Sequence, residues 1–167
     1  GFTGKVVNKD GQPLLSKVIA YCIKSKNHNP SKVNTTFTAE TDEEGNFRFA
    51  ELIPGDYVIL SIPLNRDYVP GYYKQNDFAV LKWKDATIIT VGEVMVDMIF
   101  EVKHHNRGEL GLVKIDGKIV KAGGGIIETK SEISQENIAV AGALVYIVDD
   151  FGLVSDYGYT NSNGEFN

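Results

Sequence analysis

Aromatic and amide side chains that could bind a ligand gather in one part of the chain, residues 68–83. Tyr72, Tyr73 and Trp83 lie there, with Asn76 between them. Aromatic rings combine a broad apolar face with a polar tip, and an amide group both donates and accepts hydrogen bonds. The spacing therefore suggests a sugar-binding platform of Tyr72, Tyr73, Asn76 and Trp83. The alternative is that this segment folds back over one end of a β-sandwich, which would bury the rings.

The histidines and the single cysteine form no catalytic pattern. His104 and His105 are adjacent, and neighbours in an extended chain point to opposite sides, so they cannot act as the one-face pair of a zinc helix. His28 lies in a polar loop. Cys22 sits in the apolar run "VIAYCIK", which indicates a buried thiol. Because it is the only cysteine, an internal disulfide and a cysteine zinc site are excluded. We therefore expect no enzymatic activity and no cofactor.

Acidic turns raise the alternative of a calcium site. "NKDG", "TDEEGN" and "TNSNGE" each contain part of an oxygen-ligand loop, and Asp42, Asn161 and Asn163 are the candidate ligands. None of them completes the calcium-loop pattern, in which oxygen ligands alternate and a distal Glu closes the loop. We interpret these segments as turns and expect no metal.

Composition excludes several classes of partner. The chain has 167 residues and a formal net charge of −5, and its Lys and Arg residues form no basic run. Binding to nucleic acid or to an anionic membrane needs clustered positive charge, so neither is expected. No apolar stretch approaches the roughly 20 residues of a membrane span. The chain begins with Gly1, which we interpret as a processed start or an internal segment of a longer protein.

Short strands separated by turns are the elements that must position these side chains. Runs of β-branched and aromatic residues recur between Gly, Asn, Asp and Pro, and helical periodicity is nearly absent. In residues 94–102, "VMVDMIFEV", side chains alternate with period two, which is typical of a strand with one buried face. About seven such runs precede residue 103, which predicts an antiparallel β-sandwich over 1–103.

The pattern then restarts, which indicates an internal repeat. The matched segments are 4–11 "GKVVNKDG" with 111–117 "GLVKIDG", 15–23 "LSKVIAYCI" with 140–148 "VAGALVYIV", and 41–47 "TDEEGNF" with 160–166 "TNSNGEF". This alignment matches Tyr21 with Tyr146. It predicts a linker at 104–108 and a second repeat at 109–167 that carries a long insertion at 118–139.

The first repeat resembles the carboxypeptidase regulatory-like module, whose fold is transthyretin-like. The residues that carry the resemblance are Gly4, Asp10, Gly11, Gly45, Phe47, Phe49, Pro54, Gly55 and Tyr57. Ser16 and Lys17 depart from the Gly-Ala pair usual in that family. The resemblance implies tandem antiparallel Greek-key β-sandwiches, related to the B-type repeats of bacterial surface adhesins. Some relatives carry an internal isopeptide bond, for which Lys5 and Asp97 are the candidate partners here.

The resemblance also implies an extracellular location and a non-enzymatic role. We expect a spacer, stalk or adhesion module of a larger secreted or cell-surface protein, with neighbouring domains, a glycan or a surface protein as partners. The alternative function is a carbohydrate-binding module that uses the Tyr72–Trp83 segment.

The second repeat is expected to be truncated. It stops at the counterpart of Phe47, where the first repeat continues through several further strands. A half-sandwich leaves an open edge and an uncovered face. We expect residues 109–167 to pair with the first domain or with another chain, which would give a dimer by strand exchange.

Overall fold

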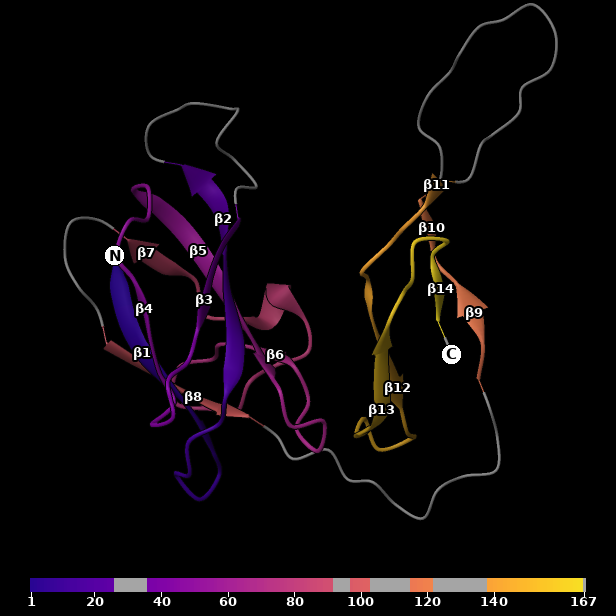
Figure 1. Cartoon of the computed structure of the whole chain (residues 1–167), viewed down its shortest axis with the longest axis horizontal. Helices are drawn as coiled ribbons and strands as arrows, with labels where there is room; N and C mark the ends of the chain where they lie inside the picture. The colour runs from indigo at the N-terminus through magenta and orange to yellow at the C-terminus, as the bar shows by residue number, and fades with distance from the viewer. Residues whose placement is uncertain (26–35, 92–96, 103–114, 122–137, 167) are drawn as a thin grey trace, which may run out of the picture. The chain divides into compact units, whose positions relative to one another are not determined.

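The computed structural model describes residues 1–25, 36–91, 97–102, 115–121 and 138–166. The chain divides into two units, residues 1–105 (unit 1) and 106–167 (unit 2). The described residues are all-β: they form several antiparallel sheets, no α-helix, and one short 3-10 turn, η2 (Trp83–Asp85) (Figure 1). This confirms the fold class predicted from the sequence.

Unit 1 contains two sheets. Its strands are β1 (Phe2–Asn8), β2 (Ser16–Ser25), β3 (Thr36–Glu40), β4 (Asn46–Phe49), β5 (Gly55–Pro63), β6 (Gly71–Tyr72), β7 (Ile89–Val91) and β8 (Asp97–Val102). One sheet has the order β4-β1-β8, and the other has the order β3-β2-β5-β6, with β7 also paired to β5. The β1–β8 pair is parallel, whereas the other pairs in unit 1 are antiparallel.

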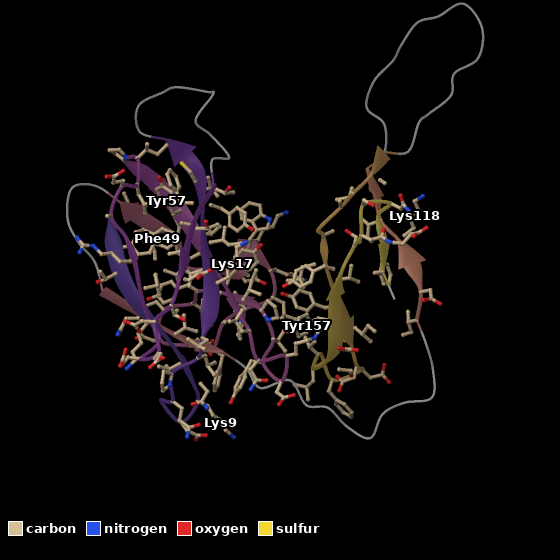
Figure 2. All side chains as sticks on the ribbon, in the orientation of Figure 1. Lys9, Lys17, Phe49, Tyr57, Lys118 and Tyr157 are labelled. Carbon is tan, nitrogen blue, oxygen red and sulfur yellow. The ribbon has the colours of Figure 1, made fainter. Side chains whose placement is uncertain are left out.

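The two sheets enclose one hydrophobic core, because alternate side chains of both point inward. Phe2, Phe47 and Phe49 come from the smaller sheet, with ring centroids of Phe2 and Phe49 5.1 Å apart. Tyr57 comes from β5 of the larger sheet and is fully buried (Figure 2). Its hydroxyl donates to the Ile53 carbonyl oxygen at 2.7 Å, so its polar tip is satisfied. Each such buried ring stabilises the fold by about 2–3 kcal/mol.

Tight turns set the connections in unit 1. Asn8 ends β1, and its side-chain oxygen accepts the backbone N–H groups of Asp10 at 3.0 Å and of Gln12 at 2.9 Å. Gly11 has φ 77°, and its N–H donates to the Asn8 carbonyl oxygen. Gly45 has φ 79°, and a Cβ atom there would lie 2.5 Å from the Val6 carbonyl oxygen. Glycine is therefore required at position 45 for both its backbone angle and its close approach to β1.

Unit 2 contains shorter strands, and each pairs antiparallel. They are β9 (Gly117–Lys118), β10 (Val120–Lys121), β11 (Ile138–Ala139), β12 (Leu144–Val148), β13 (Val154–Tyr159) and β14 (Glu165–Phe166). The pairs are β14–β9, β10–β11 and β12–β13. Tyr157 and Thr160 are buried. Lys118, which is labelled in Figure 2, belongs to β9.

The two units repeat the same backbone hydrogen bonds. The matching bonds are Val6 N to Gly45 O (2.8 Å) with Ile119 N to Gly164 O (2.7 Å), Leu14 N to Val6 O (3.0 Å) with Val140 N to Ile119 O (3.1 Å), and Thr41 N to Ser16 O (3.0 Å) with Thr160 N to Ala143 O (3.0 Å). The strand register agrees as well: Phe47 lies opposite Gly4, and Phe166 lies opposite Gly117. Unit 2 therefore contains counterparts of β1, β2, β3 and β4.

This correspondence corrects the alignment made from sequence. The counterpart of Gly4 is Gly117 rather than Gly111, so "GKVVN" matches "GKIVK". The segment 118–121, assigned to an insertion, is the end of the first strand. The extra residues instead fall within 122–137, which stands where unit 1 has residues 9–11.

The match between Tyr21 and Tyr146 is also wrong, by two residues. Ile19 lies opposite Thr38 in unit 1, and Tyr146 lies opposite Tyr157 in unit 2. Thr38 and Tyr157 are equivalent, because each lies three residues before the threonine of the following turn, Thr41 or Thr160. Tyr146 therefore takes the place of Ile19. A shift of two residues keeps every side chain on the same face, so the hydrophobic pattern could not reveal the error.

Candidate functional site

The predicted sugar platform is divided between two faces of unit 1. Tyr72 lies in β6 opposite Leu60, on the outer face of the larger sheet. Tyr73 follows it and packs against the hydrophobic core, while its backbone N–H donates to the Ile59 carbonyl oxygen at 2.8 Å. Adjacent residues in an extended chain point to opposite faces, so the two rings cannot present one surface.

A different tyrosine accompanies Tyr72. Tyr21 lies on β2 between Ala20 and Cys22, which both point into the core, so its ring is on the outer face. The ring centroids of Tyr21 and Tyr72 are 6.4 Å apart, with an interplanar angle of 46°. This distance and tilt fit a favourable aromatic pair. The alternation in "VIAYCIK" was the signal that could have assigned Tyr21 to this face.

We call this surface the tyrosine face, made of Tyr21, Tyr72 and the cross-strand neighbours Thr36 and Thr38 on β3. Thr36 lies opposite Tyr21, and Thr38 lies opposite Ile19 on the same face. Both threonines are exposed and both tyrosines are half-buried. The surface therefore offers two aromatic rings and two hydroxyl groups along neighbouring strands.

Apolar side chains adjoin the tyrosine face on the same side of the sheet. Val58 and Leu60 on β5 lie opposite Tyr21 and Ile19, and they are 2% and 5% exposed although they lie outside the main core. Val69 and Ala79 of the following connection are buried as well. That connection returns beside β6, where the Tyr72 N–H donates to the Val80 carbonyl oxygen at 2.8 Å. The 64–88 segment thus covers part of the sheet, and its apolar residues are packed.

Both tyrosines of this face are held in the neutral form. Burial raises the pKa of Tyr21. Burial also raises the pKa of Tyr72, and the nearby Tyr21 hydroxyl adds to the effect. A neutral phenol both donates and accepts hydrogen bonds, so each hydroxyl can pair with a ligand hydroxyl.

Trp83 and Asn76 lie on adjoining segments. Asn76 has φ 60°, in a turn closed by the Asp77 N–H and the Lys74 carbonyl oxygen. The Lys74 ammonium donates to the backbone oxygen of Asp85 at 2.9 Å, which ties this turn to η2. Trp83 is 49% exposed, and the Lys84 ammonium lies 6.0 Å from its ring centroid, at the limit of a cation–π contact.

An open groove occurs at the same place in each unit, between the counterparts of β3 and β4. In unit 1 its volume is about 840 Å³ and its lining includes Lys5, Glu40, Asp42 and Arg48. In unit 2 its volume is about 560 Å³ and its lining includes Lys118, Tyr159, Asn161 and Phe166. The lining is partly shared: Lys118 stands at the position of Lys5, whereas Tyr159 stands where unit 1 has Glu40. The common position of the groove follows from the strand arrangement that the two units share.

Two of the candidate calcium ligands, Asp42 and Asn161, are engaged within their own turns. The Asp42 carboxylate accepts the Asn46 backbone N–H at 2.7 Å and its side-chain amide at 3.1 Å. In unit 2 the Asn161 side-chain oxygen accepts the Asn163 and Glu165 N–H groups at 2.9 and 3.0 Å.

The side-chain pair that closes each of these turns is reversed between the units. In unit 1 the amide of Asn46 donates to Asp42, whereas in unit 2 the amide of Asn161 donates to the Glu165 carboxylate at 3.1 Å. The donor and the acceptor have exchanged positions, and the turn is preserved. These oxygens serve turn geometry in both units.

The remaining candidate residues are Cys22, Lys5, Asp97 and the three histidines. Cys22 is 1% exposed in the core, as its apolar run indicated. Asp97 lies opposite Thr3 in the β1–β8 register, and Lys5 lies opposite Ile99. His28, His104 and His105 lie outside the described residues. Across the described part of the chain, no group of three or more His, Cys, Asp or Glu side chains converges on a common point.

Neither a family model nor a curated protein matches this chain. No helix among the described residues is long and apolar enough to cross a membrane.

Proposed function

We propose that this chain is a non-enzymatic structural segment, a spacer or adhesion stalk made of repeated β-sandwich modules. The observation that carries the proposal is the parallel pairing of the first and last strands of unit 1. β1 and β8 run side by side from Thr3 opposite Asp97 to Asn8 opposite Val102. The chain therefore enters unit 1 at one end of this pair and leaves it at the other, which is the arrangement that modules in series require.

The recurrence of one hydrogen-bond pattern in both units supports a tandem array. Modules joined in series contribute length and stiffness without a ligand of their own. The transthyretin-like, carboxypeptidase regulatory-like assignment, with Greek-key sandwiches, belongs to this proposal. It is supported by the motif residues at their turns and in the core, above all Gly45, Phe47, Phe49 and Tyr57.

The location and partners follow from the same assignment. We place the module in a secreted or cell-surface protein, where neighbouring domains are its main contacts. A surface protein or glycan of another cell would be the target of the parent protein as a whole.

Unit 2 adds a proposal about partners. In unit 1, β2 pairs with β5 as well as with β3, whereas among the described residues β12 pairs only with β13. Val148, at the end of β12, is 47% exposed, and Phe151 beyond it is 89% exposed. We infer that the free edge of β12 accepts a strand from another domain or another chain, since an open apolar edge favours such pairing.

The spacer function is tested by the distance between the two ends of unit 1. In the full chain, a donor dye at residue 1 and an acceptor inserted after residue 105 report this distance by single-molecule energy transfer. A spacer gives one narrow distribution that does not change when glycans are added. A denatured segment of this length would instead spread around roughly 55–60 Å. Two populations in native buffer, or a distance that shifts with a ligand, would contradict the proposal.

The second candidate function is carbohydrate binding at the tyrosine face. It is favoured by the Tyr21–Tyr72 ring pair, which is half-buried and bordered by the exposed Thr36 and Thr38. Trp83 adds an exposed ring on η2, and its fluorescence provides a signal.

A glycan array with the full chain tests this candidate. If a glycan binds here, Tyr72→Ala weakens binding about tenfold, which is near the upper value for one aromatic contact. The matched control is Tyr159→Ala, an exposed tyrosine in unit 2, which should leave binding unchanged. Absence of binding to every glycan, or equal loss in both variants, would remove this candidate.

A further inference from the structure

β8 is an edge strand of unit 1 in the part of the chain that the structure describes. It lies at the edge of the sheet β4-β1-β8, and among the described residues it pairs only with β1. Six register pairs join the two strands, from Thr3 with Asp97 to Asn8 with Val102. Any force that leaves unit 1 through the end of β8 must therefore cross this ladder.

β1 has two strand neighbours among the described residues, whereas β8 has one. Its side chains Phe2 and Val6 are fully buried in the core. On its other side it pairs antiparallel with β4, from Phe2 opposite Phe49 to Lys5 opposite Asn46. Pulling β1 out of the unit would break two ladders, whereas β8 shares one ladder with the described strands, so the ladder between β1 and β8 is the weaker link.

The direction of the two strands decides how this ladder is stressed. Tension on the chain pulls β1 toward its start and β8 toward its end. Because the strands are parallel, these pulls act in opposite directions along the strand axes. All the ladder hydrogen bonds, evenly spaced in a parallel pair, then resist sliding together. If β8 ran antiparallel to β1, the same tension would open the bonds one at a time from one end.

We propose that unit 1 resists mechanical force through a shear-stressed clamp formed by β1 and β8. The inference rests on the proposed function, because only a spacer within a larger surface protein would transmit tension along its chain. It goes further by giving the module a mechanical role and by assigning that role to one strand pair.

Two pulling directions on the same protein test the clamp. In the first, the full 167-residue chain is held at residue 1 and at its C-terminus, which shears the β1–β8 pair. In the second, it is held at position 10, through an azide-bearing residue in the exposed β1–β2 turn, and at the C-terminus. Position 10 follows the end of β1, so this force acts at the Asn8–Val102 end and opens the pair from there.

The azide handle leaves the buried Cys22 unmodified, and unit 2 lies in the force path in both arrangements. Unfolding of unit 1 is recognised by its length gain, roughly 350 Å for about 100 residues. Thermal unfolding of the two handled proteins verifies that their stability is equal.

The clamp predicts that unit 1 unfolds at a force about threefold or more higher in the first direction, because the ladder bonds break together rather than in succession. Equal forces in the two directions would overturn the clamp while leaving the spacer function intact. A broad end-to-end distance without applied force would instead contradict the spacer function, so the two failures are distinguishable.

Discussion

Thr41 and Thr160 hold equivalent positions in the two units. The Thr41 hydroxyl accepts the Ser16 backbone N–H at 2.8 Å and donates to the Leu14 carbonyl oxygen at 3.2 Å. The Thr160 hydroxyl accepts the Ala143 N–H at 2.9 Å and donates to the Val140 carbonyl oxygen at 2.5 Å. Each hydroxyl thus joins the turn before the fourth strand to the start of the second.

The turn glycines should differ in their tolerance of alanine. Gly45→Ala places a Cβ 2.5 Å from the Val6 carbonyl oxygen, and Gly164→Ala places one against the Ile119 carbonyl oxygen. Gly11 also has positive φ but has open space around it. Gly11→Ala should lower the free energy of unfolding by about 1–2 kcal/mol through backbone strain, and the other two by more. Urea denaturation measures all three, and equal losses would show that steric contact with the Val6 and Ile119 carbonyl oxygens is unimportant.

Acid should weaken unit 1 through Asp42. Hydrogen bonds from the side chain and backbone of Asn46 lower the pKa of the Asp42 carboxyl. The stabilisation that the ionised Asp42 carboxylate contributes is therefore fully present when the pH is above the unfolded pKa of about 3.9. It is lost as the pH falls through the lower folded pKa. Asp42→Asn should destabilise unit 1 near neutral pH, and its difference from the parent should shrink below about pH 4. A difference that is constant across this range would contradict the assignment.

The two tyrosines of the tyrosine face should titrate as neighbours. Burial and the proximity of Tyr21 raise the pKa of Tyr72 above the ordinary value of about 10. The stabilisation contributed by the two neutral phenol groups is present when the pH is below the ordinary pKa of about 10, and it is lost as the pH rises through the folded pKa. Tyr21→Phe should lower the pKa of Tyr72, as followed by NMR of labelled tyrosine rings. Tyr68→Phe, which alters a ring against the main core, should leave it unchanged.

The edge of β12 that has no strand partner among the described residues should govern association. If this edge pairs with another copy, light scattering will show a dimer at micromolar concentration. Val148→Lys should shift the equilibrium to monomer, because lysine on an edge opposes strand pairing. Lys118→Glu, in β9, is the matched surface change and should have no effect. A monomer at every concentration would leave a neighbouring domain as the partner of β12.

The strands and turns of unit 1 were predictable because their signals are local. "TDEEGNF" contains its own turn chemistry: Asp42 accepts the hydrogen bonds and Gly45 supplies the positive φ. The burial of Phe47 and Phe49 follows from the same alternation. Each of these features can be predicted without knowing which residues from distant parts of the sequence lie nearby.

The repeat register was not predictable in the same way. "GLVKIDG" at 111–117 and "GKIVK" at 117–121 both resemble the first strand. What distinguishes them is that Phe166 pairs with Gly117, a contact between residues far apart in the chain. Only the fold reveals such a pairing.

The arrangement of the tyrosines was not predictable for a simpler reason. Tyr72 and Tyr73 were grouped because they are adjacent in the sequence, but adjacent residues of a strand point apart. Tyr21 was omitted because it lies far away along the chain, yet its ring is the one beside Tyr72.

The most direct test of the central claim, that this chain is built from repeated copies of one module, is a pair of threonine variants. Thr41→Val and Thr160→Val each remove the acceptor of a backbone N–H, that of Ser16 or Ala143, at a cost of about 1–3 kcal/mol. Hydrogen exchange of the full chain resolves the two units. Thr41→Val should reduce protection in unit 1 alone, and Thr160→Val should reduce it by a similar amount in unit 2 alone, with Thr→Ser at either position retaining it. A loss at one threonine and none at the other would contradict the claim.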